Sequence, residues 1–228
     1  MRIVLIAAKQ LALAKTRLAP ALPSVAERAL LAEAMFRDVL SAAMSARTAD
    51  RIAVVTSDQV LIAAARAVHA MVIDEQFPRG LNAAVSLATD QLLLAGADTI
   101  CTILSDIPLI TGADIDDALA AQAEIDRQGA AESARRGQNS VVLIPSRDFS
   151  GTNMIVRTPP DVIPTQFGRL SLVRHREDCL KRAIPCEIVR LMRPALDLDL
   201  PADLIEFARA PSMTHTYGHL ARLGILHS

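Results

Sequence analysis

Residues 2–27 read R-I-V-L-I-A-A-K-Q-L-A-L-A-K-T-R-L-A-P-A-L-P-S-V-A-E, and this stretch decides the fold class. Its first seven residues are a short, continuous apolar run rich in β-branched side chains, which is typical of a strand buried on both faces. A proline-containing loop follows. Ser24 and Glu27 then form a capping-box pattern that opens a long Ala- and Leu-rich helix reaching about Ala46. The stretch therefore predicts a strand, a loop and a helix in succession.

The same alternation continues along the chain. Further strands are expected at 51–56, 70–73, 99–104, 140–145, 153–157 and 186–191, and further helices at 59–68, 81–94, 111–128, 170–182 and from 201 onward. Strands that alternate with helices favour right-handed βαβ units. No internal repeat or domain boundary is visible. The sequence thus predicts an α/β, single-domain, Rossmann-like fold with a mostly parallel central sheet flanked by helices, comprising residues 1–210 and followed by a C-terminal tail, 211–228.

Composition narrows the function classes. The 228 residues fit one α/β domain, and with 51% hydrophobic but only 3% aromatic residues the core must consist of Ala, Leu, Ile and Val. A net charge of -1 gives no bulk attraction to nucleic acid or to an anionic membrane. We expect no membrane span, because the sequence contains no uncharged run of 18 residues. We also expect no signal peptide, because the apolar run from Ile3 to Ala8 is too short for one. Three cysteines without a C-x-x-C pair argue against a disulfide framework and favour a reducing, cytoplasmic location.

Cationic side chains follow the first expected strand. In open parallel sheets, ligands bind beyond the carboxyl ends of the strands. The loop after the first strand carries Lys9, Lys15 and Arg17, and three cations at a strand end can cradle a triphosphate. An ordinary solvated loop is the alternative. Neither G-x-G-x-x-G nor G-x-x-x-x-G-K-[ST] is present, so dinucleotide-binding and P-loop interpretations lose their main support.

Three aspartates are candidates for a metal site. Asp106 comes directly behind the apolar run 99–104, in S-D-I-P-L. Asp197 and Asp199, in L-D-L-D-L, are separated by one residue and point to the same face of an extended backbone. Two carboxylates on one face repel unless a cation lies between them, and carboxylates are ligands for hard cations. The alternative is a set of turn and helix-capping residues; the metal interpretation predicts bound Mg²⁺.

Glycine-containing loops supply further candidates. Gly80 and Asn82, in R-G-L-N, lie where a backbone can approach a nucleoside. Thr152, in G-T-N, and Gly168 and Ser171, in F-G-R-L-S, lie at a strand boundary and a helix start. Exposed N–H groups and hydroxyls at a helix start favour a phosphate or a carboxylate. Plain turns and caps are the alternative for each.

The histidines contribute little to this interpretation. His69 and His175 are expected to be surface or hydrogen-bonded side chains. His215 and His219 have the spacing of a helical metal pair, but no third ligand is evident, so a solvated tail is favoured.

Taken in order, these motifs resemble a known family. A-A-K followed by A-K-T-R-L, then G-L-N, S-D-I-P-L, G-T-N, F-G-x-x-S and L-D-L-D-L-P, is similar to the phospholactate guanylyltransferases of coenzyme F-420 biosynthesis over about residues 1–208. Members have a single α/β nucleotidyltransferase domain related to the molybdenum-cofactor nucleotidyltransferases and the nucleotide-diphospho-sugar enzymes. The resemblance implies that the metal is bound by Asp106, Asp197 and Asp199, and the phospho-acid by Thr152, Gly168 and Ser171. It implies that GTP is bound by the Lys9–Arg17 loop and the Gly80–Asn82 turn. The residues implied to be catalytic are Asp106, Lys9, Lys15 and Arg17.

The implied reaction transfers GMP from GTP to 2-phospho-L-lactate, phosphoenolpyruvate or 3-phospho-D-glycerate and releases diphosphate, with Mg²⁺ as cofactor. The product would pass to a downstream deazaflavin transferase, and a homodimer is common in such folds. The phosphate of the acceptor, with a second pKa of about 6, is already an anion at neutral pH, so no general base is required.

Two departures from the family are Ala8, where it usually has Pro, and Ser105, where it usually has Ala. Neither removes a charged or hydrogen-bonding group. The rival hypotheses are another nucleotidyltransferase of the molybdenum-cofactor or sugar-phosphate type, for which a Gly-rich first loop would be expected, and a non-catalytic nucleotide-binding regulator.

Overall fold

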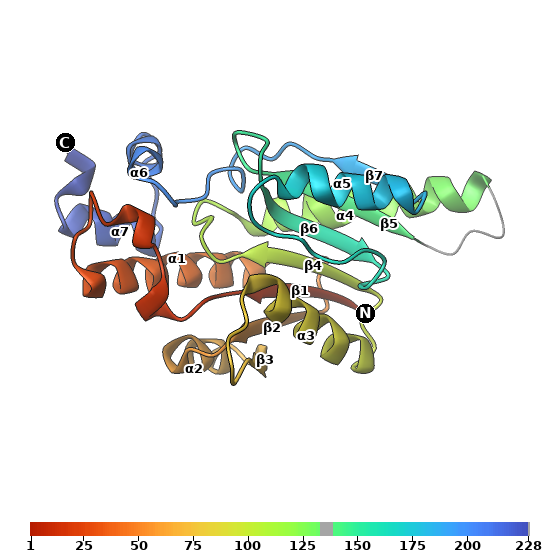
Figure 1. The fold of residues 1–228 in the computed structure, drawn as a ribbon, viewed down its shortest axis with the longest axis horizontal. Coiled ribbons are helices and arrows are strands. Elements are labelled where there is room, and N and C mark those ends of the chain that lie inside the picture. Colours follow the sequence, from red (N-terminus) through yellow and green to blue (C-terminus); the bar gives the residue numbers. More distant parts are fainter. Residues whose placement is uncertain (133–138, 228) are drawn as a thin grey trace.

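The chain folds into a central β-sheet that is covered by helices (Figure 1). The computed structural model describes residues 1–132 and 139–227. The strands are β1 (Arg2–Ala7), β2 (Arg51–Thr56), β3 (Met71–Asp74), β4 (Thr99–Leu104), β5 (Ser140–Pro145), β6 (Thr152–Thr158) and β7 (Cys186–Ile188). The helices are α1 (Val25–Ser45), α2 (Gln59–Ala67), α3 (Leu81–Leu94), α4 (Gly112–Glu132), α5 (Ser171–Lys181), α6 (Pro201–Ala208) and α7 (His215–Arg222). The polar sequence E-S-A-R-R-G-Q-N, residues 132–139, predicts an exposed connection, and it falls almost wholly outside the described residues.

The strand order is β3-β2-β1-β4-β6-β5-β7. β1 pairs in parallel with β2 and β4, as does β2 with β3 and β5 with β7. β6 runs antiparallel between β4 and β5. The predicted mostly parallel, single-domain α/β fold is confirmed.

Both faces of β1 are buried, as its continuous apolar run predicts. Val4 and Ile6 pack into the cluster formed with α1, α2 and α4, whereas Ile3 and Leu5 pack on the opposite face with α3 and α5. Successive side chains of a strand point to opposite faces, so an alternating polar residue would place a polar group in one of the two cores. Helices therefore cover the sheet on both sides, with α3 and α5 nearer the viewer in Figure 1.

Helix starts follow their local signals, whereas some ends do not. The Ser24 hydroxyl accepts a hydrogen bond from the Glu27 N–H at 3.3 Å, confirming where α1 begins. α4 continues to Glu132, four residues beyond the expected end. The last strand is shorter than the expected 186–191: β7 ends at Ile188 and, among the described strands, pairs with β5 alone at the edge of the sheet. An edge strand has a partner on one side only, so few ladder contacts hold it in register.

Beyond the sheet, α6 and α7 form a third apolar cluster with α1 and the loop after β1. The carboxylate of Asp38 on α1 accepts hydrogen bonds from the N–H groups of His215 and Thr216, at 2.7 and 2.9 Å, which attaches the start of α7. His219 is buried as a result, so the expectation of a solvated tail is wrong at this side chain. No helix in the described ranges is both long and apolar enough to cross a membrane.

Candidate active site

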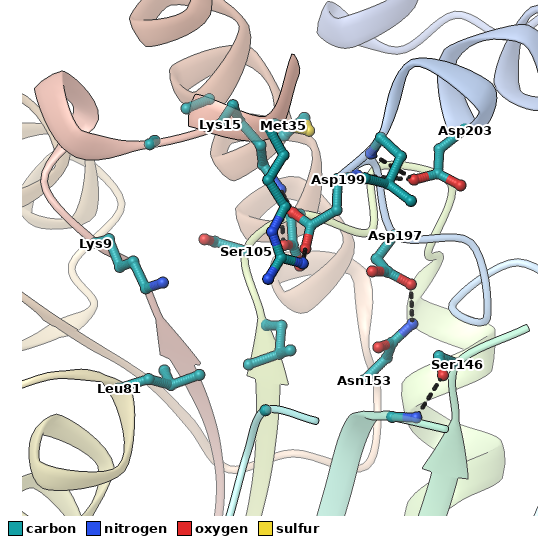
Figure 2. Close-up of a pocket in the computed structure, with 18 of the residues that line it drawn as sticks. Lys9, Lys15, Met35, Leu81, Ser105, Ser146, Asn153, Asp197, Asp199 and Asp203 are labelled. Carbon is teal, nitrogen blue, oxygen red and sulfur yellow. Dashed lines mark hydrogen bonds and ion pairs between the residues drawn. The ribbon is translucent and has the colours of Figure 1, made fainter. Parts of the chain in front are cut away.

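The topology brings three loops together at one edge of the sheet. In the sheet, β2 and β3 lie on one side of β1, and β4 lies on its other side. β1 and β4 therefore flank a topological switch point, which is where a ligand-binding crevice forms in open parallel sheets. Because β6 is antiparallel to β4, with Met154 opposite Ile103, β6 begins where β4 ends. A cavity of about 860 Å³ opens at this edge (Figure 2).

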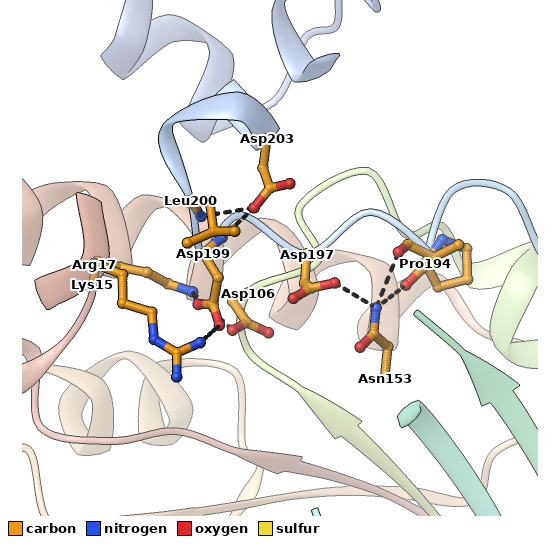
Figure 3. A network of polar contacts seen from close by, with 10 residues as sticks. Lys15, Arg17, Asp106, Asn153, Pro194, Asp197, Asp199, Leu200 and Asp203 are labelled. Carbon is orange, nitrogen blue, oxygen red and sulfur yellow. Dashed lines mark hydrogen bonds and ion pairs between the residues drawn. The ribbon is translucent and has the colours of Figure 1, made fainter. Parts of the chain in front are cut away.

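Lys15 occupies the centre of the site. Its ammonium donates to Asp106 Oδ2 and to Asp199 Oδ1, both at 2.8 Å, and only 7% of its side chain is exposed (Figure 3). Burial alone would lower the pKa of this lysine, but the charges of the two carboxylates outweigh burial and raise it. The side chain therefore stays protonated and supplies a fixed positive charge between two acids.

Local packing places this lysine. Leu18, three residues on, is fully buried against Leu31 and Met35 of α1, which anchors the loop after β1. The Leu11 N–H donates to Asp58 Oδ2 at 2.9 Å and holds the loop to the start of α2. Lys15 itself adopts a left-handed conformation, with φ 54°. A strained backbone held by its surroundings is common at functional sites.

The three candidate aspartates converge, but not as a ready-made metal cage. Asp106 follows β4, and its backbone carbonyl accepts from the Leu198 N–H at 3.0 Å, which draws the L-D-L-D-L segment to the end of β4. Asp197 Oδ1 accepts from the Asn153 amide at 3.1 Å. Within the described part of the chain, no group of three or more His, Cys, Asp or Glu side chains is arranged to hold a metal ion. Instead, the Lys15 ammonium fills the space between two of the three carboxylates.

Two observations nevertheless fit a divalent cation. Asp106 Oδ1 is buried and has no hydrogen-bond partner among the described residues. Burial, and then the negative charges of Asp106 and Asp199, raise the pKa of Asp197 to about 6. Burial also opposes ionisation of Asp199, but Lys15 and Arg17 keep its pKa below the ordinary value. Carboxylate oxygens are ligands that Mg²⁺ prefers. The Oδ1 oxygen of Asp106 and the nearby carboxylate of Asp197 are therefore suitable ligands for this ion.

We expect Asp197→Asn to stabilise the metal-free protein at neutral pH. With a folded-state pKa of about 6 against an ordinary value near 3.8, the folded state holds the proton more tightly, so this carboxyl contributes progressively less stability as pH rises from about 4 to 6. The asparagine amide oxygen can still accept from Asn153. Melting temperatures in chelator should be higher for the variant than for wild type at about pH 7.5, with a clearly smaller gain at about pH 4.5, where only part of this stability is lost. An equal difference at both pH values would contradict the assignment.

The other loop cations lie at the rim. Lys9 is exposed and lines the cavity on the side of Leu81 (Figure 2). Arg17 is 74% exposed, and its guanidinium lies 3.9 Å from Asp199 Oδ2, a contact that contributes little by itself in water. Both side chains can move toward an anion entering the cavity, whereas Lys15 is held in place.

The predicted acceptor residues meet at the opposite wall. Thr152, Gly168 and Ser171 all line the cavity. The Thr152 N–H donates to Ser171 Oγ at 2.8 Å, and Gly168, with φ +117°, has a conformation that L side chains rarely adopt. Next to them, a Cβ on Gly151 would come within 2.9 Å of Ser146 Oγ, so a side chain there would displace the hydroxyl that accepts from the Gly151 N–H.

The R-G-L-N turn borders the cavity through its leucine. Leu81 lines the cavity, whereas Gly80 and Asn82 do not belong to its described lining. The Asn82 amide donates to the Phe167 carbonyl at 3.1 Å and accepts from the Phe167 N–H at 2.7 Å. Asn82 thus clamps the segment that leads to Gly168, and its interpretation as a nucleotide ligand stays a prediction.

Sequence reasoning assigned no specific role to Asn153, Arg169 or Asp203, which also line the cavity. Asn153 Nδ2 contacts the Pro194 and Ala195 carbonyls as well as Asp197, so it joins β6 to the segment bearing the aspartates. Asp203 Oδ2 accepts from the Asp199 N–H at 3.0 Å. The G-T-N motif and the acid three residues into a proline-started helix were the available signals for the first and last of these.

Comparison with known proteins gives consistent matches. A family model described as "Guanylyl transferase CofC like" matches residues 1–228. A phosphoenolpyruvate guanylyltransferase of Sphaerobacter thermophilus is 35% identical over 90% of this chain and 92% of its own. A 3-phospho-D-glycerate guanylyltransferase of Phenylobacterium zucineum is 38% identical (87% and 85%), and a 2-phospho-L-lactate guanylyltransferase of Methanothermobacter thermautotrophicus is 30% identical (92% and 85%).

Among solved structures, a Desulfovibrio desulfuricans protein assigned to the nucleotide-diphospho-sugar transferases superposes with a TM-score of 0.71 over 99% of this chain and 96% of its own. The two chains are 18% identical, so this likeness concerns the fold alone.

Proposed function

The chain belongs to the guanylyl transferase CofC like family, and we propose that it transfers GMP from GTP to a phosphorylated three-carbon acid, with release of diphosphate. The observation that carries the proposal is the convergence of Lys15, Asp106 and Asp199 at the β1–β4 switch point. The acceptor is 2-phospho-L-lactate, phosphoenolpyruvate or 3-phospho-D-glycerate, as in the named relatives, and the product serves coenzyme F-420 biosynthesis through a downstream deazaflavin transferase.

The chemistry suits the side chains present. A phosphate oxygen of the acceptor bonds to the α-phosphorus of GTP while the bond to diphosphate breaks. The nucleophile is already anionic at neutral pH, which agrees with a described cavity lining that contains neither His nor Cys. The obstacle is repulsion, since each pair of unit charges at ~4 Å costs roughly 4 kcal/mol at an effective dielectric of about 20.

Cations on the β1 loop counter this repulsion. Lys15 provides a fixed charge, and Lys9 and Arg17, which line the cavity, would reach from the rim to the triphosphate. Asp106 and Asp197, with Asp199, would hold Mg²⁺, which supplies Lewis-acid charge neutralisation when bound. Lys15 would then exchange part of its contact with the carboxylates for contact with a phosphate oxygen.

A single assay tests the function. The protein is incubated with GTP, Mg²⁺ and each of the three acids in turn, and the guanylylated acid and diphosphate are detected by mass spectrometry. We expect product with at least one acid and far less product when ATP replaces GTP. Nucleotide binding without diphosphate release from any mixture would favour the regulator hypothesis, and equal turnover with ATP would contradict guanylyl specificity.

Ser171→Ala should act on the acceptor rather than on GTP. The change deletes a hydroxyl that faces the cavity and leaves the Thr152 N–H without its 2.8 Å partner. A hydrogen bond to a charged group contributes about 1.5–3 kcal/mol. We therefore expect the acceptor KM to rise roughly ten- to a hundredfold, with a lower melting temperature and an unchanged GTP KM.

Ser24→Ala is the matched control for this variant, because it removes the cap of α1, costs about 1 kcal/mol of stability and lies away from the cavity. If both variants lose stability and neither changes the acceptor KM, Ser171 has only a structural role.

A further inference from the structure

A buried histidine lies directly behind the acceptor wall. His175, on α5, has no exposed surface, and its Nδ1 is 3.1 Å from Thr152 Oγ1. The Phe167 ring meets the imidazole edge-on, with centroids 5.6 Å apart. Neither the motifs nor the proposed chemistry gives this side chain a function. Its position four residues after Ser171 places both on the same face of the helix.

The contacts of the imidazole determine its tautomer. Nε2 accepts a hydrogen bond from the Gln166 backbone N–H at 2.8 Å, so this nitrogen carries no proton. In a neutral imidazole the proton then resides on Nδ1, which makes Nδ1 the donor to Thr152 Oγ1. Burial, followed by the nearby charge of Arg157, lowers the pKa of His175 to about 4, while Asp178 acts in the opposite direction. The ring is therefore neutral at the pH at which the enzyme would work.

A hydroxyl that accepts from His175 keeps its own hydrogen for another acceptor. Among the described residues, no further hydrogen bond to Thr152 Oγ1 is formed, and Thr152 lines the cavity. With the opposite tautomer, the hydroxyl would donate to the ring and present only lone pairs to a ligand. An anion binds the first arrangement and is repelled by the second.

We propose that His175 is a positioning residue for the acceptor: its protonated Nδ1 obliges the Thr152 hydroxyl to donate into the cavity, toward a phosphate or carboxylate oxygen. The identity of the acceptor in this inference rests on the proposed function, whereas the tautomer of His175 does not depend on it. His175 makes no contact with the reacting atoms and acts through Thr152.

The same imidazole also holds the loop that carries Gly168, through Gln166, and a purely structural role has to be separated from the positioning role. Two substitutions divide the contacts. His175→Asn can place an amide N–H near the position of Nδ1 and keep the donation to Thr152, but it loses the contact with Gln166. His175→Gln can place a carbonyl oxygen near the position of Nε2 and keep the Gln166 contact, but it loses the donation.

The positioning role predicts a definite order of the variants. The acceptor KM should rise roughly tenfold for His175→Gln and less for His175→Asn, with the GTP KM unchanged in both. In a Thr152→Val background, His175→Gln should have no further effect on the acceptor KM, because the hydroxyl through which it acts is gone. The reverse order of the two variants, or additive effects with Thr152→Val, would overturn the inference in favour of loop support alone.

A measurement on the unliganded wild-type protein separates this inference from the function. Long-range ¹H–¹⁵N NMR reports which imidazole nitrogen is protonated, and the His175 signals are assigned from the two variants. A protonated Nδ1 supports the inference, and a protonated Nε2 overturns it whether or not the protein turns over any acid. Absence of guanylyl transfer in wild type, with Nδ1 protonated, would reject the proposed function but leave the positioned hydroxyl established.

Discussion

Asp106→Asn is expected to reduce turnover by three orders of magnitude or more while leaving the protein folded, a loss of about 4 kcal/mol in transition-state stabilisation. Asp106 is bound on one side by the Lys15 ammonium, through Oδ2, and its buried Oδ1 has no partner in the described part of the chain. An amide of the same shape can neither neutralise a divalent cation nor hold the ammonium as firmly. Circular dichroism should be unchanged, because the asparagine also removes repulsion toward Asp197.

Asp90→Asn is the control for this variant, since Asp90 is exposed on α3 and is not part of the cavity lining. Steady-state kinetics with saturating GTP and acceptor decide the outcome. If Asp106→Asn keeps more than about a tenth of the wild-type rate, a change below ~1.4 kcal/mol in barrier, Asp106 is a turn residue and the metal assignment is wrong.

Lys15→Met is expected to have an effect of similar size on turnover and, in addition, to destabilise the metal-free protein. Its ammonium is nearly buried and contacts two carboxylates, so its removal leaves Asp106 and Asp199 facing each other without the cation between them, and the exposed Arg17, 3.9 Å from Asp199, compensates this little. Breaking a buried ion pair costs about 3–5 kcal/mol, and the partial exposure of Asp199 reduces this cost to roughly half. Added Mg²⁺ should raise the melting temperature of the variant more than that of wild type, because the metal no longer competes with the lysine.

Arg17→Met is the matched control, with a cation of the same loop that is largely exposed and 3.9 Å from Asp199. It should change the melting temperature little and mainly raise the GTP KM. If Lys15→Met melts like wild type in chelator and gains nothing from Mg²⁺, the lysine does not compensate the aspartates. Loss of turnover without those changes would restrict Lys15 to phosphate binding.

The fold class could be predicted from the sequence because buried positions recur with the periodicity of the helix or strand that contains them. An apolar run such as Ile3–Ala8 has no polar position to turn toward water, so it requires cover on both faces. Alternation of such runs with helices then requires a parallel arrangement for most strands. The edge strand and the antiparallel insertion of β6 were not readable, since both depend on which strands become neighbours in the sheet.

By itself, the sequence determined the kinds of side chain at the site and their loops: cations after the first strand, an acid after the fourth, and two acids before the helix at Pro201. The tertiary structure decided which of them meet. Lys15 is 91 residues from Asp106 and 184 from Asp199. The adjacency of β1 and β4 brings Lys15 to Asp106, and the hydrogen bond from the Leu198 N–H to the Asp106 carbonyl brings Asp199 to both.

The tertiary structure also decides the hydrogen bonds between Asn82 and Phe167 and between His175 and Thr152, which no local sequence pattern predicts. The hydrophobic periodicity of a sequence predicts which side chains are buried, because burial depends on the polarity of each side chain by itself. A hydrogen bond depends on the position and direction of two groups at once, and for residues far apart in the chain the packed fold alone sets both.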